Sequence, residues 1–344
     1  MARVAIIGGG NLGHAFAAVM SGENAVSVFT RRSFPRGDIV ARTRTHAVVG
    51  RPVRVCSEPE AALRDADVVF VTVPGSLHEE ALRIVAAHAP KNCLVGALPA
   101  AGLFADLATK LLDDPERVFL GREAPYNCRI SRRGDVVEIY GVAPRLGVAV
   151  LSPGAQDAIC GRVSVLLGLP VDPLSSVFVP LLRPVNTLLH PATLVRLLEV
   201  QKETGGFAEP PLLYAHWTHV TAQLYLDASS EVRALAQALG VRDLSEIQLV
   251  PQHYQTNDAD RLAERIRSIE GLRRYIAPCC LHGDRYFLDT ASRLFTEDVD
   301  ISLAHVLELT RLHGTPSATL VSLASCLSPA VRRKAANFAS GLAV

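Results

Sequence analysis

Residues 3–14 read RVAIIGGGNLGH, an apolar run followed by glycines at positions 8, 10 and 13. The run does not alternate between apolar and polar residues, which is typical of a strand buried on both faces of a parallel sheet. Gly8 fits a tight turn, Gly10 lets the backbone approach a pyrophosphate, and Gly13 lets the next helix pack closely on the strand. The stretch therefore predicts a dinucleotide site at a helix N-terminus.

Short apolar runs alternate with helical patterns through the rest of the first half. Strands are expected at 4–7, 25–29, 53–56, 68–73, 93–98 and 118–120, and helices at 14–20, 79–88 and 103–112. Strands that alternate with helices form right-handed crossovers, so the pattern predicts an α/β fold with a doubly wound parallel sheet. Two further strands, at 136–140 and 148–151, are expected to close this domain.

The periodicity of the apolar residues changes after about residue 155, where long helical patterns replace the short β-branched runs. Helices are expected at 191–202, 212–239, 259–269, 297–312 and from 316 towards the C-terminus. We expect an NAD(P)-binding domain at residues 1–160 and an all-α substrate-binding and catalytic domain at residues 161–344.

Composition limits the classes of protein that fit. The chain has 344 residues, 49% hydrophobic and 20% charged, so two domains can bury cores and disorder is excluded. A net charge of +1 gives the protein no overall positive electrostatic field that would attract nucleic acid or an anionic membrane. An odd number of cysteines, seven, indicates no disulfide framework, and no apolar run is long enough for a membrane span. A cytoplasmic protein is expected.

The residues after the second strand bear on the choice of cofactor. NAD-binding sites usually have an acidic residue there for the ribose hydroxyl, whereas this chain has Thr30, Arg31 and Arg32. Two guanidinium groups can hold a 2′-phosphate, so NADP(H) is favoured over NAD(H). The loop after the fourth strand should form a wall of the same crevice. The expected cofactor contacts are Gly8, Gly10, Asn11, Leu12, Gly13, Thr30, Arg31, Arg32, Val73 and Pro74.

Residues 181–194, LLRPVNTLLHPATL, are informative in the second half. Pro191 suits the first position of a helix, which would place His190 at the N-cap and Asn186 one turn upstream. The helix dipole would then disfavour the charged imidazolium, so His190 alone would be neutral.

A second segment, RLFTED at residues 293–298, precedes another helical pattern. Thr296 can cap that helix, with Glu297 and Asp298 in its first turn, where the dipole favours ionised carboxylates. If Asp298 faces His190, it would restore the proton affinity that the dipole removes and fix the tautomer. The pair would then be suited to acid/base catalysis near neutral pH.

These motifs together resemble the opine dehydrogenases of the octopine and nopaline type, which join a Rossmann domain to a helical one. The resemblance extends over nearly the whole chain and is carried, in order, by VxVPxxxH ending at His78, by PYxxR as Pro125, Tyr126 and Arg129, by NxxxHP as Asn186, His190 and Pro191, and by RxxTED as Arg293, Thr296, Glu297 and Asp298. The paired arginines after the second strand are closer to the NADPH-using branch that makes opine-type metallophores.

The resemblance implies a reductive condensation of an amino acid with a 2-oxo acid such as pyruvate or 2-oxoglutarate, through an imine, to give a secondary amine. It implies His190 as the catalytic histidine and Asp298 as its paired aspartate. It further implies that Asn186 lies near the oxo-acid site and that Arg293 binds a substrate carboxylate. A homodimer is expected, with small-molecule substrates as its ligands.

Two other functions stay open on the sequence. One is a 2-oxo or hydroxy acid reductase of the ketopantoate reductase or glycerol-3-phosphate dehydrogenase type, which relies on a lysine, here Lys202. The other is a protein that senses NADPH without turnover. No metal site is expected, because neither His216 with His219 nor Cys279 with Cys280 is completed by further ligands at a metal-binding spacing.

Overall fold

The computed structural model describes residues 1–100 and 102–327. The chain folds as two compact units, Met1–Pro180 and a second one from Leu181 onward. The sequence suggested a boundary at residue 160. The first unit extends about 20 residues further because helix α5 and strand β12, defined below, both pack onto its main sheet.

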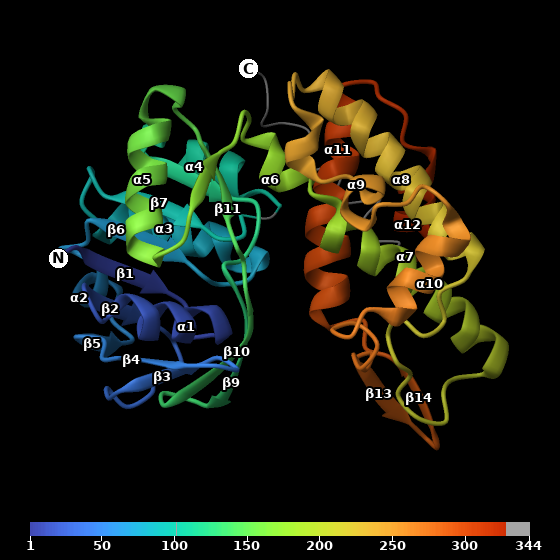
Figure 1. The fold of residues 1–344 in the computed structure, drawn as a ribbon, viewed down its shortest axis with the longest axis horizontal. Helices are drawn as coiled ribbons and strands as arrows, with labels where there is room; N and C mark the ends of the chain where they lie inside the picture. The colour runs from blue at the N-terminus through green and yellow to red at the C-terminus, as the bar shows by residue number, and fades with distance from the viewer. Residues whose placement is uncertain (101, 328–344) are drawn as a thin grey trace. The chain divides into compact units, whose positions relative to one another are not determined.

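The first unit is built on an eight-stranded sheet in the order β12-β11-β8-β7-β6-β1-β2-β5 (Figure 1). Six of these strands run parallel, and β11 pairs antiparallel with β8. The expected doubly wound Rossmann-type sheet is confirmed. The strands are β1 (Arg3–Ile7), β2 (Ala25–Phe29), β5 (Arg54–Cys56), β6 (Val68–Val71), β7 (Leu94–Ala97), β8 (Val118–Gly121), β11 (Leu146–Val150) and β12 (Val171–Pro173).

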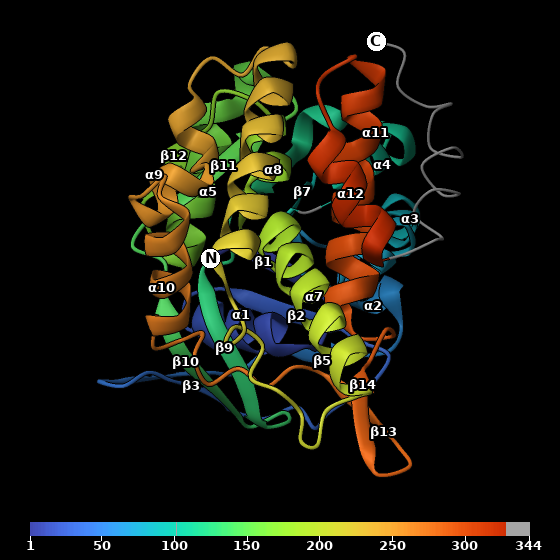
Figure 2. The same cartoon turned by 90° about the vertical axis from the view of Figure 1, so that its right-hand side faces the viewer.

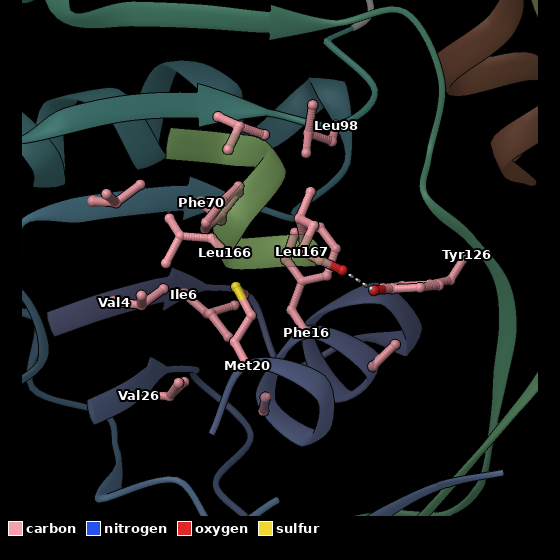
Figure 3. Close-up of a cluster of buried hydrophobic side chains, with 14 of the residues drawn as sticks. Val4, Ile6, Phe16, Met20, Val26, Phe70, Leu98, Tyr126, Leu166 and Leu167 are labelled. Carbon is pink, nitrogen blue, oxygen red and sulfur yellow. Dashed lines mark hydrogen bonds between the residues drawn. The ribbon is translucent and has the colours of Figure 1, made fainter. Parts of the chain in front are cut away.

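Helices cover both faces of this sheet. On one face Val4 and Ile6 of β1 pack into a cluster with α1 and α5, and on the other Ala5 and Ile7 pack into a cluster with α2, α3 and α4. Figure 3 shows the first cluster, with Phe16 of α1 among the apolar side chains. Burial on both faces explains why the β1 sequence does not alternate. The helices are α1 (Asn11–Met20), α2 (Pro59–Leu63), α3 (His78–His88), α4 (Phe104–Leu111) and α5 (Gln156–Leu167).

A second sheet of four strands, in the order β4-β3-β10-β9, packs against α1. Its strands are β3 (Ile39–Arg42), β4 (Ala47–Gly50), β9 (Tyr126–Arg132) and β10 (Val136–Val142). The run at 136–140 was expected to be a strand that closes this domain, and it is strand β10. It pairs with its hairpin neighbour β9 and with β3, and not with a strand of the main sheet. Sequence periodicity predicts a strand but not its partner, because strand pairing is non-local.

The second unit is mainly helical, as expected. Helix α7 lies beside α8, α12 and a π-helix, η5 (Figure 2). Its helices are α7 (Pro184–Thr204), α8 (His219–Ala238), α9 (Val250–Tyr254), α10 (Ala259–Ser268), η5 (Leu294–Leu303), α11 (Ala304–Leu312) and α12 (Ala318–Leu327), and it also has a hairpin of β13 (Cys279–His282) and β14 (Arg285–Leu288). The remaining short helices are η4 (Leu244–Ile247) in this unit, α6 (Phe178–Leu182) at the boundary of the two units, and η1 (Gly75–Leu77), η2 (Pro115–Arg117) and η3 (Pro153–Ala155) in the first unit.

Helix α7 begins earlier than the sequence suggested. Pro184, and not Pro191, occupies the helix start, so His190 lies within the helix and is not its N-cap. The dipole argument for a neutral His190 is therefore wrong. Pro191 inside the helix lacks an N–H group, so the carbonyl of Thr187 loses its helical partner. Two prolines seven residues apart both fit a helix start, and the sequence alone favoured the wrong one.

Two other helix starts also differ. Residues 212–218 were expected to be helical, but Leu212 forms a β-bridge with Ile276 and residues 213–216 form a turn. Helix α8 begins at His219, where the Thr218 hydroxyl accepts from the N–H of Thr221. Thr296 does not cap a helix, because η5 already begins at Leu294 and the Thr296 hydroxyl donates to the Ser292 carbonyl at 3.2 Å. The helix expected from 316 towards the C-terminus is α12, and its expected part beyond Leu327 lies outside the described residues.

Within the described part of the chain, no helix combines the length and the apolar character that a membrane span requires.

Candidate active site

A pocket in the first unit opens at the carboxyl ends of β1, β2 and β6. Of the residues expected to contact a cofactor, seven line it: Gly8, Gly10, Thr30, Arg31, Arg32, Val73 and Pro74. The crevice at the carboxyl ends of parallel strands is where doubly wound folds bind nucleotides. Asn11, Leu12 and Gly13 are not among the lining residues.

The glycine turn has the room that a dinucleotide needs. Gly8 has a φ of +120°, a conformation that favours glycine. A Cβ on Gly10 would meet no atom within 4 Å, so the backbone is open to a close neighbour there. Helix α1 has no side-chain cap at Gly10, which leaves the first N–H groups of the helix available to an anion. These features fit the diphosphate of NAD(P)(H).

Gly13 has a structural role instead. A Cβ there would lie 1.9 Å from the carbonyl oxygen of Gly8. The side chain of Asn11 also faces away from the pocket, because its amide oxygen accepts from the N–H of Ile130 at 2.9 Å.

The glycine positions give a paired prediction. Replacing Gly13 by Ala should lower unfolding stability by about 3 kcal/mol through overpacking, equivalent to roughly 6–12 °C in Tm. Replacing Gly10 by Ala should leave the Tm unchanged but weaken cofactor binding, because the methyl group occupies the space for the phosphates. Thermal unfolding and a titration that follows NADPH fluorescence measure the two effects. Equal losses of stability in the two variants would contradict this division of roles.

Arg133, which the sequence analysis did not single out, also lines the pocket. It lies in the turn between β9 and β10, and its guanidinium donates to the carbonyl of Gly9 at 3.0 Å and to that of Arg32. The neighbouring Gly134 N–H donates to Nε2 of His14 at 2.9 Å. The hairpin thus holds a third positive charge beside the glycine turn.

One carboxylate lies in the same pocket. Glu80 of α3 accepts a hydrogen bond from Arg31, and both side chains are largely exposed. This ion pair raises the pKa of Arg31 above its ordinary value, the hydrogen bond to Glu80 being the main cause. Glu80 would compete with a phosphate for Arg31, and the spacing of the sequence motif gave no sign of it.

The second unit brings His190 and Asp298 together, although they are 108 positions apart. Nδ1 of His190 lies 2.7 Å from a carboxylate oxygen of Asp298, and their side chains are 14% and 15% exposed. Because an ionised carboxylate only accepts, Nδ1 carries the proton and Nε2 is the basic nitrogen of the neutral ring. The π-helix η5 presents Asp298 to α7, and such helices are frequent at functional sites.

The other ring nitrogen of His190 is also bonded. Nε2 lies 2.9 Å from the hydroxyl oxygen of Tyr214, a residue in the turn that precedes α8. Tyr214 is 3% exposed. Burial raises the pKa of this phenol well above its ordinary value, so the hydroxyl keeps its proton at neutral pH. The sequence analysis did not predict this contact.

The other two expected substrate residues lie on the same two helices. Asn186 is four residues before His190 on α7 and therefore shares its helix face, and its side chain is exposed. Arg293 is at the start of η5, five residues before Asp298, and is also exposed. His78, by contrast, is buried against Phe104 within the first unit.

Two family models match the chain. The model for the alpha-helical domain of NAD/NADP octopine/nopaline dehydrogenases covers residues 173–331. The model for coenzyme F420-dependent NADP oxidoreductases covers residues 3–98, which contain the glycine turn. The two models therefore match different parts of the chain, one in the first unit and the other almost entirely in the second.

Curated relatives match over most of the chain. An uncharacterized protein of Sinorhizobium fredii is 26% identical over 92% of each chain. The octopine dehydrogenase of Mizuhopecten yessoensis is 23% identical, over 88% of this chain and 83% of its own.

Solved structures share the fold. Octopine dehydrogenase with NADH and pyruvate matches with a TM-score of 0.80 at 20% identity, covering 96% of this chain and 89% of that one. Yersinopine dehydrogenase with NADP+ matches with a TM-score of 0.77 at 12% identity, covering 99% and 93%.

Proposed function

We propose that the chain is an NADP(H)-using member of the opine dehydrogenase family, an oxidoreductase family that acts on CH–NH bonds. It would join the amino group of an amino acid to a 2-oxo acid such as pyruvate or 2-oxoglutarate. The observation that carries the proposal is the pairing of His190 with Asp298 at 2.7 Å.

Support for NADP(H) comes from the charge around the pocket. Arg31, Arg32 and Arg133 all line it, and planar guanidinium groups are suited to binding a phosphate. A related structure, that of yersinopine dehydrogenase, holds NADP+, whereas octopine dehydrogenase holds NADH. Glu80, in contrast, favours NADH, because a carboxylate in this pocket can accept a hydrogen bond from a ribose hydroxyl.

The bound cofactor supplies the hydride that reduces the imine. The chain itself handles the protons. His190 accepts or donates at Nε2, while Asp298 holds Nδ1–H, fixes the tautomer and stabilises the positively charged ring when it forms. Dehydration of the carbinolamine, the adduct of amine and oxo acid, needs a proton on the leaving hydroxyl, and protonated His190 is the source of that proton.

Substrate carboxylates need a cation. Arg293 is exposed at the start of the helix that also carries Asp298, so it can form a bidentate pair with the carboxylate of a substrate close to the acid/base pair. Asn186, one helical turn from His190, offers an amide to the oxo acid.

The lysine-dependent reductase is the weaker alternative. Lys202 is exposed in the last turn of α7, twelve residues after His190 and hence about 18 Å further along the helix axis. It therefore lies far from the acid/base pair. A protein that senses NADPH would not need a histidine held at both ring nitrogens.

A substrate panel tests the proposal. The protein is mixed with NADPH, a pool of amino acids and one of pyruvate, oxaloacetate or 2-oxoglutarate, and the nicotinamide absorbance is followed. We expect the absorbance to fall only when amine and oxo acid are both present. A fall with oxo acid alone would indicate the hydroxy acid reductase, and no fall in any mixture would favour the sensor.

A further inference from the structure

Both ring nitrogens of His190 are engaged within the second unit. Nδ1 is hydrogen-bonded to Asp298 at 2.7 Å, and Nε2 is hydrogen-bonded to the Tyr214 hydroxyl at 2.9 Å. A proton that enters or leaves Nε2 in this arrangement meets the Tyr214 oxygen first. Given the proposed function, on which this inference rests, either the tyrosine moves aside or it takes part.

The turn that carries Tyr214 is held on both sides. The N–H of Leu213 donates to the carbonyl of Tyr275 at 2.7 Å, and the N–H of Ala277 donates to the carbonyl of Pro211 at 2.8 Å. After the turn, Nε1 of the buried Trp217 donates to the Thr193 hydroxyl of α7 at 2.9 Å. These bonds fix the tyrosine relative to the helix that carries His190, which argues against a side chain that swings away.

The contact between the two rings is made by the hydroxyl. The ring centroids of His190 and Tyr214 are 6.3 Å apart with an interplanar angle of 35°, so the rings do not stack. A phenol can donate and accept at the same time, which a proton relay requires. Burial is the main cause of the raised pKa of the Tyr214 phenol, and the charges of Tyr254, Tyr275 and Asp298 raise this pKa further.

We propose that Tyr214 is the proton relay between Nε2 of His190 and the substrate oxygen. In the dehydration of the carbinolamine, the Tyr214 O–H bond breaks as its proton moves to the leaving hydroxyl, which departs as water while the amine lone pair forms the C=N bond. In the same step the Nε2–H bond of protonated His190 breaks, and that proton restores the phenol. The imidazole ends neutral, the product is an iminium ion, and no phenolate accumulates.

Tyr214→Phe tests the relay because it removes only the oxygen atom. We expect kcat to fall roughly tenfold or more, a part of the 10²- to 10⁴-fold that general acid/base catalysis contributes. The KM for the cofactor should stay unchanged, and the solvent deuterium isotope effect on kcat should lose the contribution of the second moving proton. Tyr286→Phe is the control, since Tyr286 is a half-buried tyrosine of the same unit whose phenol makes no hydrogen bond to His190 in the described structure; it should keep the wild-type kcat and isotope effect.

The hydrogen bond itself has a readout that needs no turnover. In the ¹⁵N spectrum of histidine-labelled protein, the Nε2 resonance of His190, assigned from its loss in His190→Asn, should shift in Tyr214→Phe and not in Tyr286→Phe.

Different results would overturn different claims. Wild-type kcat and isotope effect in Tyr214→Phe would overturn the relay, and a raised kcat would do so as well, because it would mean that the tyrosine blocks the histidine. An unshifted Nε2 resonance would remove the hydrogen bond on which the relay depends. If instead the wild-type protein turns over no mixture of amine and oxo acid, the proposed function fails, and the spectrum still reports on the contact.

Discussion

The variant His190→Ala is expected to lose roughly 100- to 10,000-fold in kcat, the range attributed to general acid/base catalysis. Cofactor binding should stay nearly intact, because the nucleotide pocket is lined by residues of the first unit only. Steady-state kinetics with the amine and oxo acid found in the panel give kcat, and a fluorescence titration with NADPH gives Kd.

His219→Ala is the control for this prediction. His219 is a histidine of the same unit that also pairs with a carboxylate, that of Asp260 at 3.1 Å, but its side chain is 58% exposed. It should keep full activity. A fully active His190→Ala variant would contradict the assignment of His190 as the acid/base residue. A loss of NADPH binding in that variant would show that the substitution also disturbs the nucleotide pocket.

The second large effect concerns the choice of cofactor. Replacing Arg31 and Arg32 together by Ala should weaken NADPH roughly 10- to 100-fold, because hydrogen bonds to charged groups contribute about 1.5–3 kcal/mol. NADH, which lacks the 2′-phosphate, should be affected little. Arg132→Ala is the control, since its side chain is 75% exposed, pairs with Asp135 and does not line the pocket. Equal losses for both cofactors would mean that the arginines serve folding.

The variant Glu80→Gln also distinguishes a pocket adapted to NADPH from one adapted to NADH. If the pocket is adapted to NADP(H), removing the carboxylate frees Arg31 and should tighten NADPH binding. If Glu80 accepts from a ribose hydroxyl, the same variant should weaken NADH instead. Glu79→Gln is its control, because Glu79 lies on the same helix and pairs with Arg83 outside the pocket.

The sequence predicted the features that local patterns encode. The glycine spacing and the unbroken apolar run predicted the turn between β1 and α1 that lines the pocket, because both are requirements of a few adjacent residues. The meeting of His190 with Asp298 followed from two short motifs, although the reasoning about the helix ends was wrong. The contact depends on how α7 and η5 pack, and both helices carry these residues whichever residue begins them.

Features that arise from distant pairings could not be predicted in this way. Arg133 reaches the glycine turn only because the β9–β10 hairpin packs on α1, and no spacing in the sequence encodes that contact. Tyr214 was placed within an expected helix at 212–239, and nothing in its spacing from His190 indicated that the two side chains meet. It lies in a turn because α8 begins at the Thr218 cap, seven residues later than expected.

The β9–β10 hairpin holds the glycine-rich segment in place. Asn11 and His14 of the glycine-rich segment find their partners at Ile130 and Gly134, more than a hundred residues downstream. A truncated polypeptide ending near residue 98 would keep every glycine of the motif yet expose a completely buried imidazole. We therefore expect dinucleotide binding to depend on both stretches of chain, so that the N-terminal segment grafted alone onto another scaffold would not bind the cofactor.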